Sequence, residues 1–161
     1  MRVLKAMSEV RGRLDLNEFA RIVGLTPNQT VESMQELVKA DLLRKTGGGY
    51  GITETGKVML KAFTPVPDGM EFHFYIAVDQ PAGFTVKSFL DFYETIKLIS
   101  VGSLEFHLHR GDFEKWTRKA LNDAEFADDL AKLQKPELKG EKLRKAIIKA
   151  AESTYGLEKL Q

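Results

Sequence analysis

The chain contains no cysteine, which excludes disulfide bonds, cysteine-ligated metal centres and thiol nucleophiles. It also lacks an apolar run long enough to span a membrane, and its N-terminus lacks the apolar core of a signal peptide. We therefore expect a cytoplasmic protein with no membrane partner. The chain also has almost no excess of positive or negative charge, because 24 Lys and Arg are balanced by 23 Asp and Glu, for a formal net charge of +1. This balance excludes a globally basic coat for nucleic acid, so any contact with DNA has to use a local patch.

What is present is an ordinary globular composition, with 43% hydrophobic and 29% charged residues in a chain of 161. Two of the five prolines fall within residues 64–69 beside an aspartate and a glycine, a combination that interrupts helices and strands. We predict a first domain over 1–64, a linker over 65–70 and a second domain over 71–161. Residues 1–64 hold 10 basic and 7 acidic residues, whereas residues 65–161 hold 14 and 16, so the two parts differ in the sign of their charge.

The first part has the apolar spacing of short amphipathic helices. Two helices come first, the second opening after Asp15 and stopping at Gly24. Thr26 then reads as an N-cap followed by Pro27 at the first helical position of a third helix. Two short strands surround the glycine run at 47–49, and a last helix follows Thr53. The predicted order is helix, helix, helix, hairpin, helix.

That order, carried by the string LNEFARIVGLTPNQTVESMQELVKADLLRKTGGGYGITETGKVML, resembles the winged-helix DNA-binding domains of prokaryotic and archaeal transcription regulators. The resemblance covers about residues 1–63. It implies that the helix at 27–40 enters the major groove of DNA while the hairpin at 44–50 touches the phosphate backbone or the minor groove. The candidate DNA-binding residues combine hydroxyls and amides for bases or phosphates with cations for phosphates. They are Thr26, Asn28, Gln29, Thr30, Ser33, Arg44, Lys45 and Tyr50.

Two carboxylates on the third helix, Glu32 and Glu36, favour a different interpretation. They repel phosphate unless they accept a hydrogen bond from the amino group of cytosine. The alternative function is therefore a protein–protein adaptor, in which the winged helix does not bind DNA.

In the second part, aromatic and β-branched residues over 71–78 predict a buried strand, and a helix that starts at Thr85 or at residues 87–88 follows to about residue 100. Strict alternation over 104–109 predicts a second strand, which a right-handed crossover would place parallel to the first. Asp112 is predicted to cap a helix, another helix follows residues 122–123, and a last basic amphipathic helix follows Gly140. The expected fold class is α+β, with a winged helix-turn-helix joined to a small α/β domain of few strands and several helices.

The string FHFYIAVDQPAGFTVKSFLDFYETIKLISVGSLEFHLHRGDFEKWTRKALNDAEFADDLAKL resembles an uncharacterised domain family of archaeal and some bacterial proteins. The hallmark of that family is S-[LI]-E-[FY]-H-x-x-R-x-D-F-x-x-W followed by D-x-x-[LF]-A. The matching residues are Ser103, Glu105, His107, Arg110, Asp112, Phe113, Trp116, Asp123, Phe126 and Ala127. A Thr-Gly turn of the family appears here as Ala82-Gly83. The resemblance implies no activity, because the family has none assigned.

His107, Arg110 and Asp112 are the candidate polar or ligand-binding residues of this part. On the predicted strand, His107 and His109 would share a face with Glu105 and approach Asp112, so these groups could bind a metal or a ligand. A ligand- or metal-processing domain is nevertheless the least favoured of the three functions. A simpler interpretation is structural: Asp112 caps a helix, Arg110 pairs with a carboxylate and His107 donates to the backbone. Phe113 and Trp116 would then fill the core.

The sequence holds no nucleophile elbow, no P-loop and no dinucleotide-binding glycine pattern. We therefore expect no enzyme activity, catalytic residue, metal or cofactor.

The last basic segment, 132–149, contains seven basic and two acidic residues. It is either a solvated helix face or an auxiliary patch for the DNA backbone. Together the two parts predict a DNA-binding transcription regulator with a ligand-sensing or dimerisation domain at its C-terminal end. The expected partners are double-stranded DNA, a second copy of the chain, and an unknown small ligand or protein.

Overall fold

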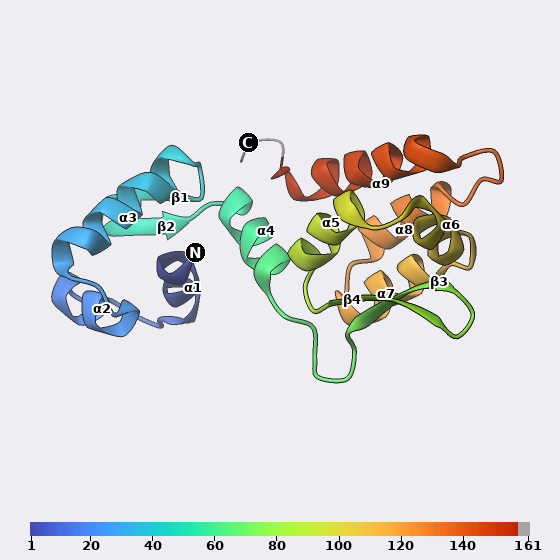
Figure 1. The fold of residues 1–161 in the computed structure, drawn as a ribbon. Helices are drawn as coiled ribbons and strands as arrows, with labels where there is room; N and C mark the ends of the chain where they lie inside the picture. The colour runs from blue at the N-terminus through green and yellow to red at the C-terminus, as the bar shows by residue number, and fades with distance from the viewer. Residues whose placement is uncertain (158–161) are drawn as a thin grey trace. The chain divides into compact units, whose positions relative to one another are not determined.

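The computed structural model describes residues 1–157, and within them the protein is α+β, with nine helices and two antiparallel hairpins (Figure 1). The chain divides into two compact units, Met1–Lys61 and the part from Ala62 onward. We call them the N-terminal and C-terminal units. No helix within the described residues is long and apolar enough to cross a membrane.

The N-terminal unit has the order predicted from the sequence: three helices, a hairpin and a further helix. Its elements are α1 (Arg2–Glu9), α2 (Leu16–Val23), α3 (Pro27–Lys39), β1 (Leu43–Thr46), β2 (Gly49–Ile52) and α4 (Glu54–Phe63), the last of which continues into the C-terminal unit. Strands β1 and β2 pair antiparallel from Leu43 opposite Ile52 to Thr46 opposite Gly49.

Local capping explains where α2 and α3 begin. The Asp15 carboxylate accepts a hydrogen bond from the backbone N–H of Glu18 at 2.9 Å, and the Thr26 hydroxyl accepts one from Gln29 at 3.2 Å. In both cases the third helical residue reaches back to the capping residue, which completes a capping box. Gly24 ends α2 in the left-handed conformation, with φ of 68°, as helix C-termini favour.

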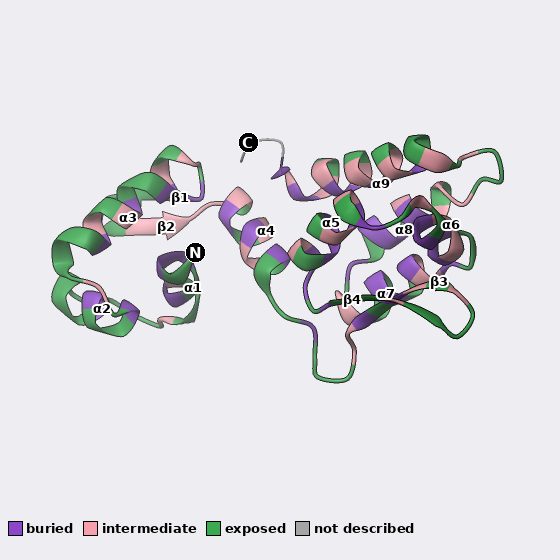
Figure 2. Ribbon diagram, viewed as in Figure 1, coloured by how far each residue is buried: buried purple, intermediate pink, exposed green. Residues whose placement is uncertain are grey.

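The apolar stripes of these helices meet in the core of the N-terminal unit, whose buried residues are drawn purple in Figure 2. They include Leu4, Phe19, Val23, Leu37 and Leu43. Helix α4 begins close to this core, because the Thr53 hydroxyl donates to the carbonyl of Asp41 and accepts from the N–H of Gly56.

The segment 65–70, which we expected to be a linker, is fastened to the C-terminal unit. Val66 is buried and its N–H donates to the carbonyl of Lys87 at 2.6 Å. The carbonyl of Met70 accepts from the indole N–H of Trp116 at 2.7 Å. These bonds fix one end of the segment beside the end of β4 and the other end to α7.

The C-terminal unit starts with a hairpin and continues with helices. Its elements are β3 (Phe72–Ala77), β4 (Gln80–Val86), α5 (Phe89–Leu98), α6 (Val101–His109), α7 (Asp112–Ala120), α8 (Ala124–Lys132) and α9 (Gly140–Tyr155). The strand expected over 71–78 is confirmed as β3, and the helices expected after residues 85–88, 122–123 and 140 are confirmed as α5, α8 and α9.

The expected parallel pairing is wrong, because β3 pairs antiparallel with β4 directly after it in the chain. The turn lies at residues 78–79, with Asp79 at φ of 58°, so Ala82-Gly83 is not the turn but lies inside β4. Pro81 and Gly83, with φ of 79°, hid this strand from the sequence analysis, because both residues normally weaken a strand.

The strand expected over 104–109 is also wrong, since these residues belong to helix α6. The Ser100 hydroxyl caps the helix by accepting from the N–H of Ser103 at 3.3 Å. Leu104 and Leu108 alternate with polar residues, but they are also four residues apart, so both face the core of the unit from one side of a helix. The short segment satisfies both periods, and only its packing decides between them.

Replacing Gly56 by alanine is expected to lower the free energy of unfolding of the N-terminal unit by about 1–3 kcal/mol, the usual cost of overpacking. A Cβ there would overlap the carbonyl oxygen of Leu42 and lie 2.8 Å from Ile52 Cγ2. Residue-resolved amide hydrogen exchange in α3 measures the change. The control is Gly102→Ala in α6, followed by amide exchange in that helix. A Cβ there meets nothing within 4 Å apart from its chain neighbours and the backbone of its own helix, so a helical Gly→Ala change should be neutral or stabilising. Equal responses of the two variants would contradict the packing argument.

Candidate functional site

The exposed face of α3 carries a row of polar side chains at helical spacing: Asn28, Glu32, Gln35 and Lys39. Glu36 lies beside this row, and its carboxylate binds the Lys39 ammonium at 2.7 Å. The row therefore presents amides and one carboxylate to solvent, together with a lysine that is already neutralised by its neighbour. This surface suits hydrogen bonding to base edges better than it suits binding phosphate.

The structure sorts the residues that we predicted on α3 by their accessibility. Asn28 is exposed, Ser33 is half-buried, and Gln29 is exposed but uses its side-chain oxygen to accept from the N–H of Thr26 at 3.0 Å. Thr30 is fully buried and its hydroxyl donates to the carbonyl of Thr26 at 2.9 Å. The prediction that Thr30 contacts DNA through its side chain is therefore wrong, because that side chain faces the core.

Strand β1 carries the two predicted cations of the hairpin. Arg44 and Lys45 are exposed, and Lys45 pairs with the half-buried Tyr50 across the hairpin. The Arg44 Nε atom lies 3.6 Å from where a Cβ at Gly51 would be, so its side chain runs over a position without a side chain of its own.

A third cation reaches the same hairpin from a distant part of the chain. Arg13 lies between α1 and α2, and its Nη2 atom is 2.8 Å from where a Cβ at Gly48 would be. We call Arg13, Arg44 and Lys45 the wing cluster, after the wing that the sequence analysis predicts for this hairpin. Within residues 1–157, none of the three has an ion pair with a carboxylate. The sequence analysis missed Arg13, because 35 residues separate it from Gly48 and no local pattern links them.

In the C-terminal unit, the predicted residues His107, Arg110 and Asp112 lie together. His107 is 3% exposed, and its Nδ1 atom is 2.9 Å from Oδ2 of Asp112. The same carboxylate oxygen accepts from Nε of Arg110 at 3.2 Å, and the Arg110 guanidinium lies 4.7 Å from the centre of the Phe106 ring. Asp112 is the first residue of α7, whereas the N-cap is Gly111, so the predicted capping role of Asp112 is wrong.

The backbone settles which ring nitrogen of His107 carries the proton. The N–H of Tyr75 donates to Nε2 of His107 at 2.7 Å, so Nε2 must hold a lone pair and the proton resides on Nδ1, from which it is donated to Asp112. We had expected His107 to donate to the backbone, and the direction is the opposite. Both nitrogens are engaged, so neither is available to abstract a proton or to bind a metal in this arrangement.

His107 and Ser103 together complete the outer edge of strand β3. Besides the N–H held by His107, the carbonyl of Tyr75 accepts from the Ser103 hydroxyl at 2.6 Å. Side chains of α6 thus satisfy both backbone groups that a neighbouring strand would otherwise pair. Because α6 is a helix, His109 points away from His107, and the shared face expected for these two residues does not form. Within the described chain, no three His, Asp or Glu side chains are grouped to hold a metal ion.

Other residues of the hallmark pattern also hold the fold together. The Glu105 carboxylate accepts from the N–H of Gly140 at 2.8 Å, while Phe113, Phe126 and Ala127 are completely buried. Asp123 caps α8 through the N–H of Phe126 at 3.0 Å and accepts from the Tyr155 hydroxyl at 2.6 Å. Burial, followed by this hydrogen bond, raises the pKa of Tyr155.

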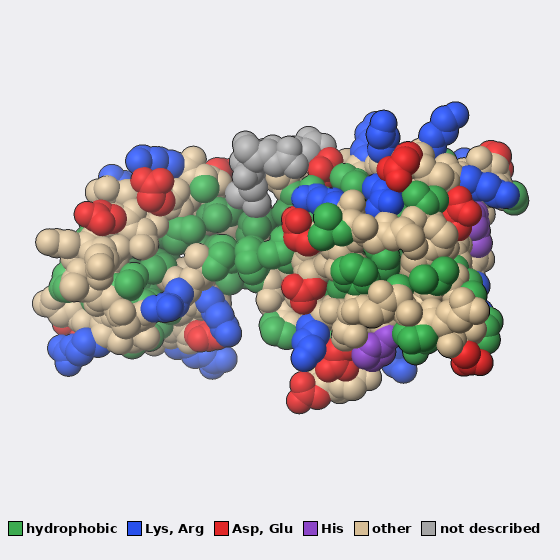
Figure 3. Space-filling view, viewed as in Figure 1, with side chains coloured by type: hydrophobic (Ala, Val, Ile, Leu, Met, Phe, Trp, Pro, Cys, Tyr) green, Lys and Arg blue, Asp and Glu red, His purple; other side chains and the backbone are tan. Residues whose placement is uncertain are grey.

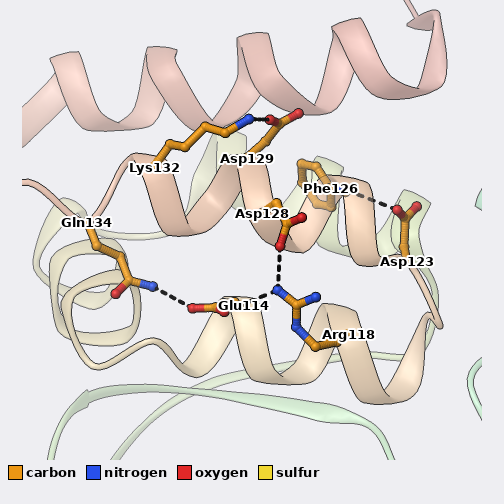
Figure 4. A network of polar contacts seen from close by, with 8 residues as sticks. All are labelled: Glu114, Arg118, Asp123, Phe126, Asp128, Asp129, Lys132 and Gln134. Atoms are coloured by element: carbon orange, nitrogen blue, oxygen red, sulfur yellow. Dashed lines mark hydrogen bonds and ion pairs between the residues drawn. The ribbon is translucent and has the colours of Figure 1, made fainter.

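Charged contacts tie α7 to α8, as Figure 4 shows. The Arg118 guanidinium lies between Glu114 on its own helix, at 3.2 Å, and Asp128 on α8, at 2.6 Å. Gln134 donates to the other oxygen of Glu114 at 3.1 Å. The pattern S-L-E-F-H-x-x-R-x-D-F-x-x-W and the residues around it therefore encode packing and hydrogen bonding.

A groove of about 600 Å³ lies along β3, α6 and α7. It is lined by aromatic residues, including Tyr75 and Phe106, and by three basic and three acidic side chains. The six charged residues are Glu71, Asp79, Arg110, Asp112, Lys115 and Lys119. This balance gives the groove no preference for an anion or a cation.

Acidification is expected to destabilise the C-terminal unit through His107. Burial lowers the pKa of His107, and this effect exceeds the opposing effect of the hydrogen bond that Nδ1 donates to Asp112. The usual pKa of histidine is about 6.5, and below that pH protons bind preferentially to the unfolded chain. The stability that the neutral ring contributes is therefore fully present above about pH 6.5 and is lost as the pH falls. Urea unfolding at a series of pH values, followed by fluorescence of the single tryptophan, Trp116, measures this loss.

The matched controls are two glutamine variants. His107→Gln should remove this part of the pH dependence, whereas His109→Gln at the exposed end of α6 should retain it. If His107→Gln unfolded with the pH profile of the unmodified chain, the assignment of the neutral ring would be incorrect.

Comparison with known proteins adds no assignment to these surfaces. No family model matches the chain, and no curated protein or solved structure matches it. A functional proposal therefore rests on the chemistry of the residues themselves.

Proposed function

We propose that the protein is a DNA-binding transcription regulator whose N-terminal unit acts as a winged helix. In this proposal α3 enters the major groove, and the β1–β2 hairpin is the wing that contacts the phosphate backbone. The wing cluster is the observation that carries the proposal. Arg13, Arg44 and Lys45 bring three cations to one hairpin without a carboxylate partner among the described residues.

The chemistry of the wing supports a phosphate contact. Residues 47–49 are glycines, so the hairpin tip has no side chains to hold its backbone away from a ligand. Each lysine or arginine that neutralises a phosphate releases counterions, which makes the affinity depend on salt with a slope of about 0.9 per contact. Three such contacts give a sequence-independent attraction that a chain of net charge +1 would not provide as a whole.

The exposed row on α3 supplies the groups for base recognition in this proposal. Asn28 can bind adenine through both its donor and its acceptor, and Gln35, which lies on the same row, offers the same chemistry. Glu32 repels phosphate but can accept a hydrogen bond from the amino group of cytosine. Recognition by α3 and attraction by the wing are thus divided between separate residues.

We assign the C-terminal unit a ligand-sensing or dimerisation role. The groove along β3, α6 and α7 is the surface available for a ligand, with Arg110 and Lys115 at its wall. His107 and Asp112 then serve as supports for that wall, since their polar atoms are already bound to each other and to the backbone. Dimerisation would let two N-terminal units read two half-sites of one operator.

An adaptor role is the alternative, and two observations favour it. Glu32 and Glu36 make the exposed face of α3 partly acidic. A hollow of about 440 Å³ beside the hairpin is lined largely by apolar side chains, and Leu14 and Leu16 in its lining are each 40% exposed. A protein partner could fill such a hollow, whereas DNA would not.

Removing the cations of the wing is expected to weaken binding to duplex DNA and to reduce its salt dependence. Arg44→Ala combined with Lys45→Ala should make the slope of log affinity against log salt shallower by about 1.8, and Arg13→Ala by about 0.9. Fluorescence anisotropy at several salt concentrations measures the slope, on a duplex selected from a random pool.

Lys57→Ala is the control, because Lys57 already pairs with Glu54 at 2.6 Å, and its slope should stay close to that of the unmodified chain. Absence of measurable binding at low salt would reject the DNA proposal. Capture of one protein partner with equal affinity by the unmodified chain and by the wing variants would support the adaptor.

A further inference from the structure

Three lysines form a stripe along the last helix of the C-terminal unit. Lys142, Lys145 and Lys149 are exposed and lie on one face of α9, at spacings of three and four residues. Blue side chains project from the surface over α9 in Figure 3. Lys135 and Lys139, both exposed, continue the charge into the segment before the helix. We call Lys142, Lys145 and Lys149 the α9 stripe.

Four lysines on other helices show a pattern of pairing that is absent from the α9 stripe. Each pairs with an acidic residue three positions earlier, at distances of 2.6 to 2.9 Å. The pairs are Glu36–Lys39, Glu54–Lys57, Glu94–Lys97 and Asp129–Lys132. In α9 the residue three positions before Lys145 is Lys142, and the residue four positions before Lys149 is Lys145. The stripe therefore places like charges where those four pairs place opposite ones, an arrangement that destabilises a helix.

The carboxylates on α9 are committed to other groups, and so is the carboxylate that reaches the first residue of α9 from α6. Glu141 binds the Arg144 guanidinium through both oxygens, at 3.0 and 3.1 Å. Glu152 accepts from the Tyr93 hydroxyl at 2.7 Å, and Glu105 accepts from the backbone N–H of Gly140 at 2.8 Å. Within residues 1–157, no carboxylate forms an ion pair with any of the three lysines of the stripe.

The opposite side of α9 shows which anionic surface can lie against the stripe. Leu143 and Ile147 are completely buried in the core of the unit, and Ala151 is 1% exposed. The helix therefore has no apolar side to insert into a lipid bilayer, as a membrane-surface helix would need. An anion must approach the lysines from solvent and present several charges in a row.

We propose that the α9 stripe is a second contact for the phosphate backbone of duplex DNA, separate from the wing. From Lys142 to Lys149 the helix advances about 10 Å, and one strand of a duplex advances about 3.4 Å per phosphate, so the stripe spans about three phosphates. This inference builds on the proposed function, since it takes duplex DNA as the ligand. Its residues belong to the C-terminal unit, so they can be tested independently of the wing cluster.

The test compares three proteins as full chains in the same salt titration of duplex binding. The stripe variant carries Lys142→Gln, Lys145→Gln and Lys149→Gln, which removes three charges but keeps stems that can cover the core. Its slope of log affinity against log salt should be shallower than that of the unmodified chain by about 2.7. The charge-matched control carries Lys57→Gln, Lys97→Gln and Lys132→Gln, in which every lysine already has an acidic partner. The control should change the slope much less.

The outcomes separate this inference from the proposed function. An unchanged slope in the stripe variant overturns the second contact, even if the wing variants lose affinity. A shallower slope in the stripe variant with full affinity in the wing variants supports the second contact and contradicts the role of the wing. If the slope becomes shallower by the same amount in the stripe variant and in its control, the effect comes from net charge alone and the inference is overturned. Sedimentation of the unmodified chain with phosphatidylserine vesicles, without binding to duplex, also overturns it.

Discussion

The outer edge of strand β3 depends on a neutral imidazole. Tyr75 would present an unpaired N–H and an unpaired carbonyl in a sheet of only two strands, and His107 and Ser103 satisfy them from helix α6. Asp112 fixes the tautomer that makes this possible. Since the same carboxylate holds Arg110, the start of α7 and the wall of the groove are positioned by the same bond network. The hairpin, α6 and α7 are thereby joined through one buried ring.

The two proposed DNA contacts differ from several other charged surfaces of the chain in that their cations have no acidic partner within residues 1–157. Four helices each pair one lysine with an acidic residue of the same helix, and Arg118 on α7 is shared by Glu114 of its own helix and Asp128 of α8. The wing cluster and the α9 stripe receive no such partner among the described residues. A chain of net charge +1 can therefore carry two local cationic surfaces, because the carboxylates that the structure describes do not pair with these cations.

The N-terminal unit was predictable from its sequence to a large extent, because its signals are local. Asp15 and Thr26 cap their helices through residues three positions away, and Gly24 ends α2 in a left-handed conformation that glycine adopts readily. The C-terminal unit was less predictable. Leu104 and Leu108 satisfy the period of a strand and that of a helix, while Pro81 and Gly83 are poor strand residues that β4 nevertheless contains. Contacts between elements decided both cases.

The sequence by itself determined the caps at Asp15 and Thr26 and the charge of each part, and it supplied the candidates Arg44, Lys45, His107, Arg110 and Asp112, because each follows from residue type and short-range spacing. Tertiary structure alone decided that Arg13 lies over Gly48, that Thr30 is buried, and that His107 accepts from Tyr75. These three facts depend on packing or on residues far apart in the chain. A side chain's accessibility and proton position follow from the groups around it, and these are known only once the chain has folded.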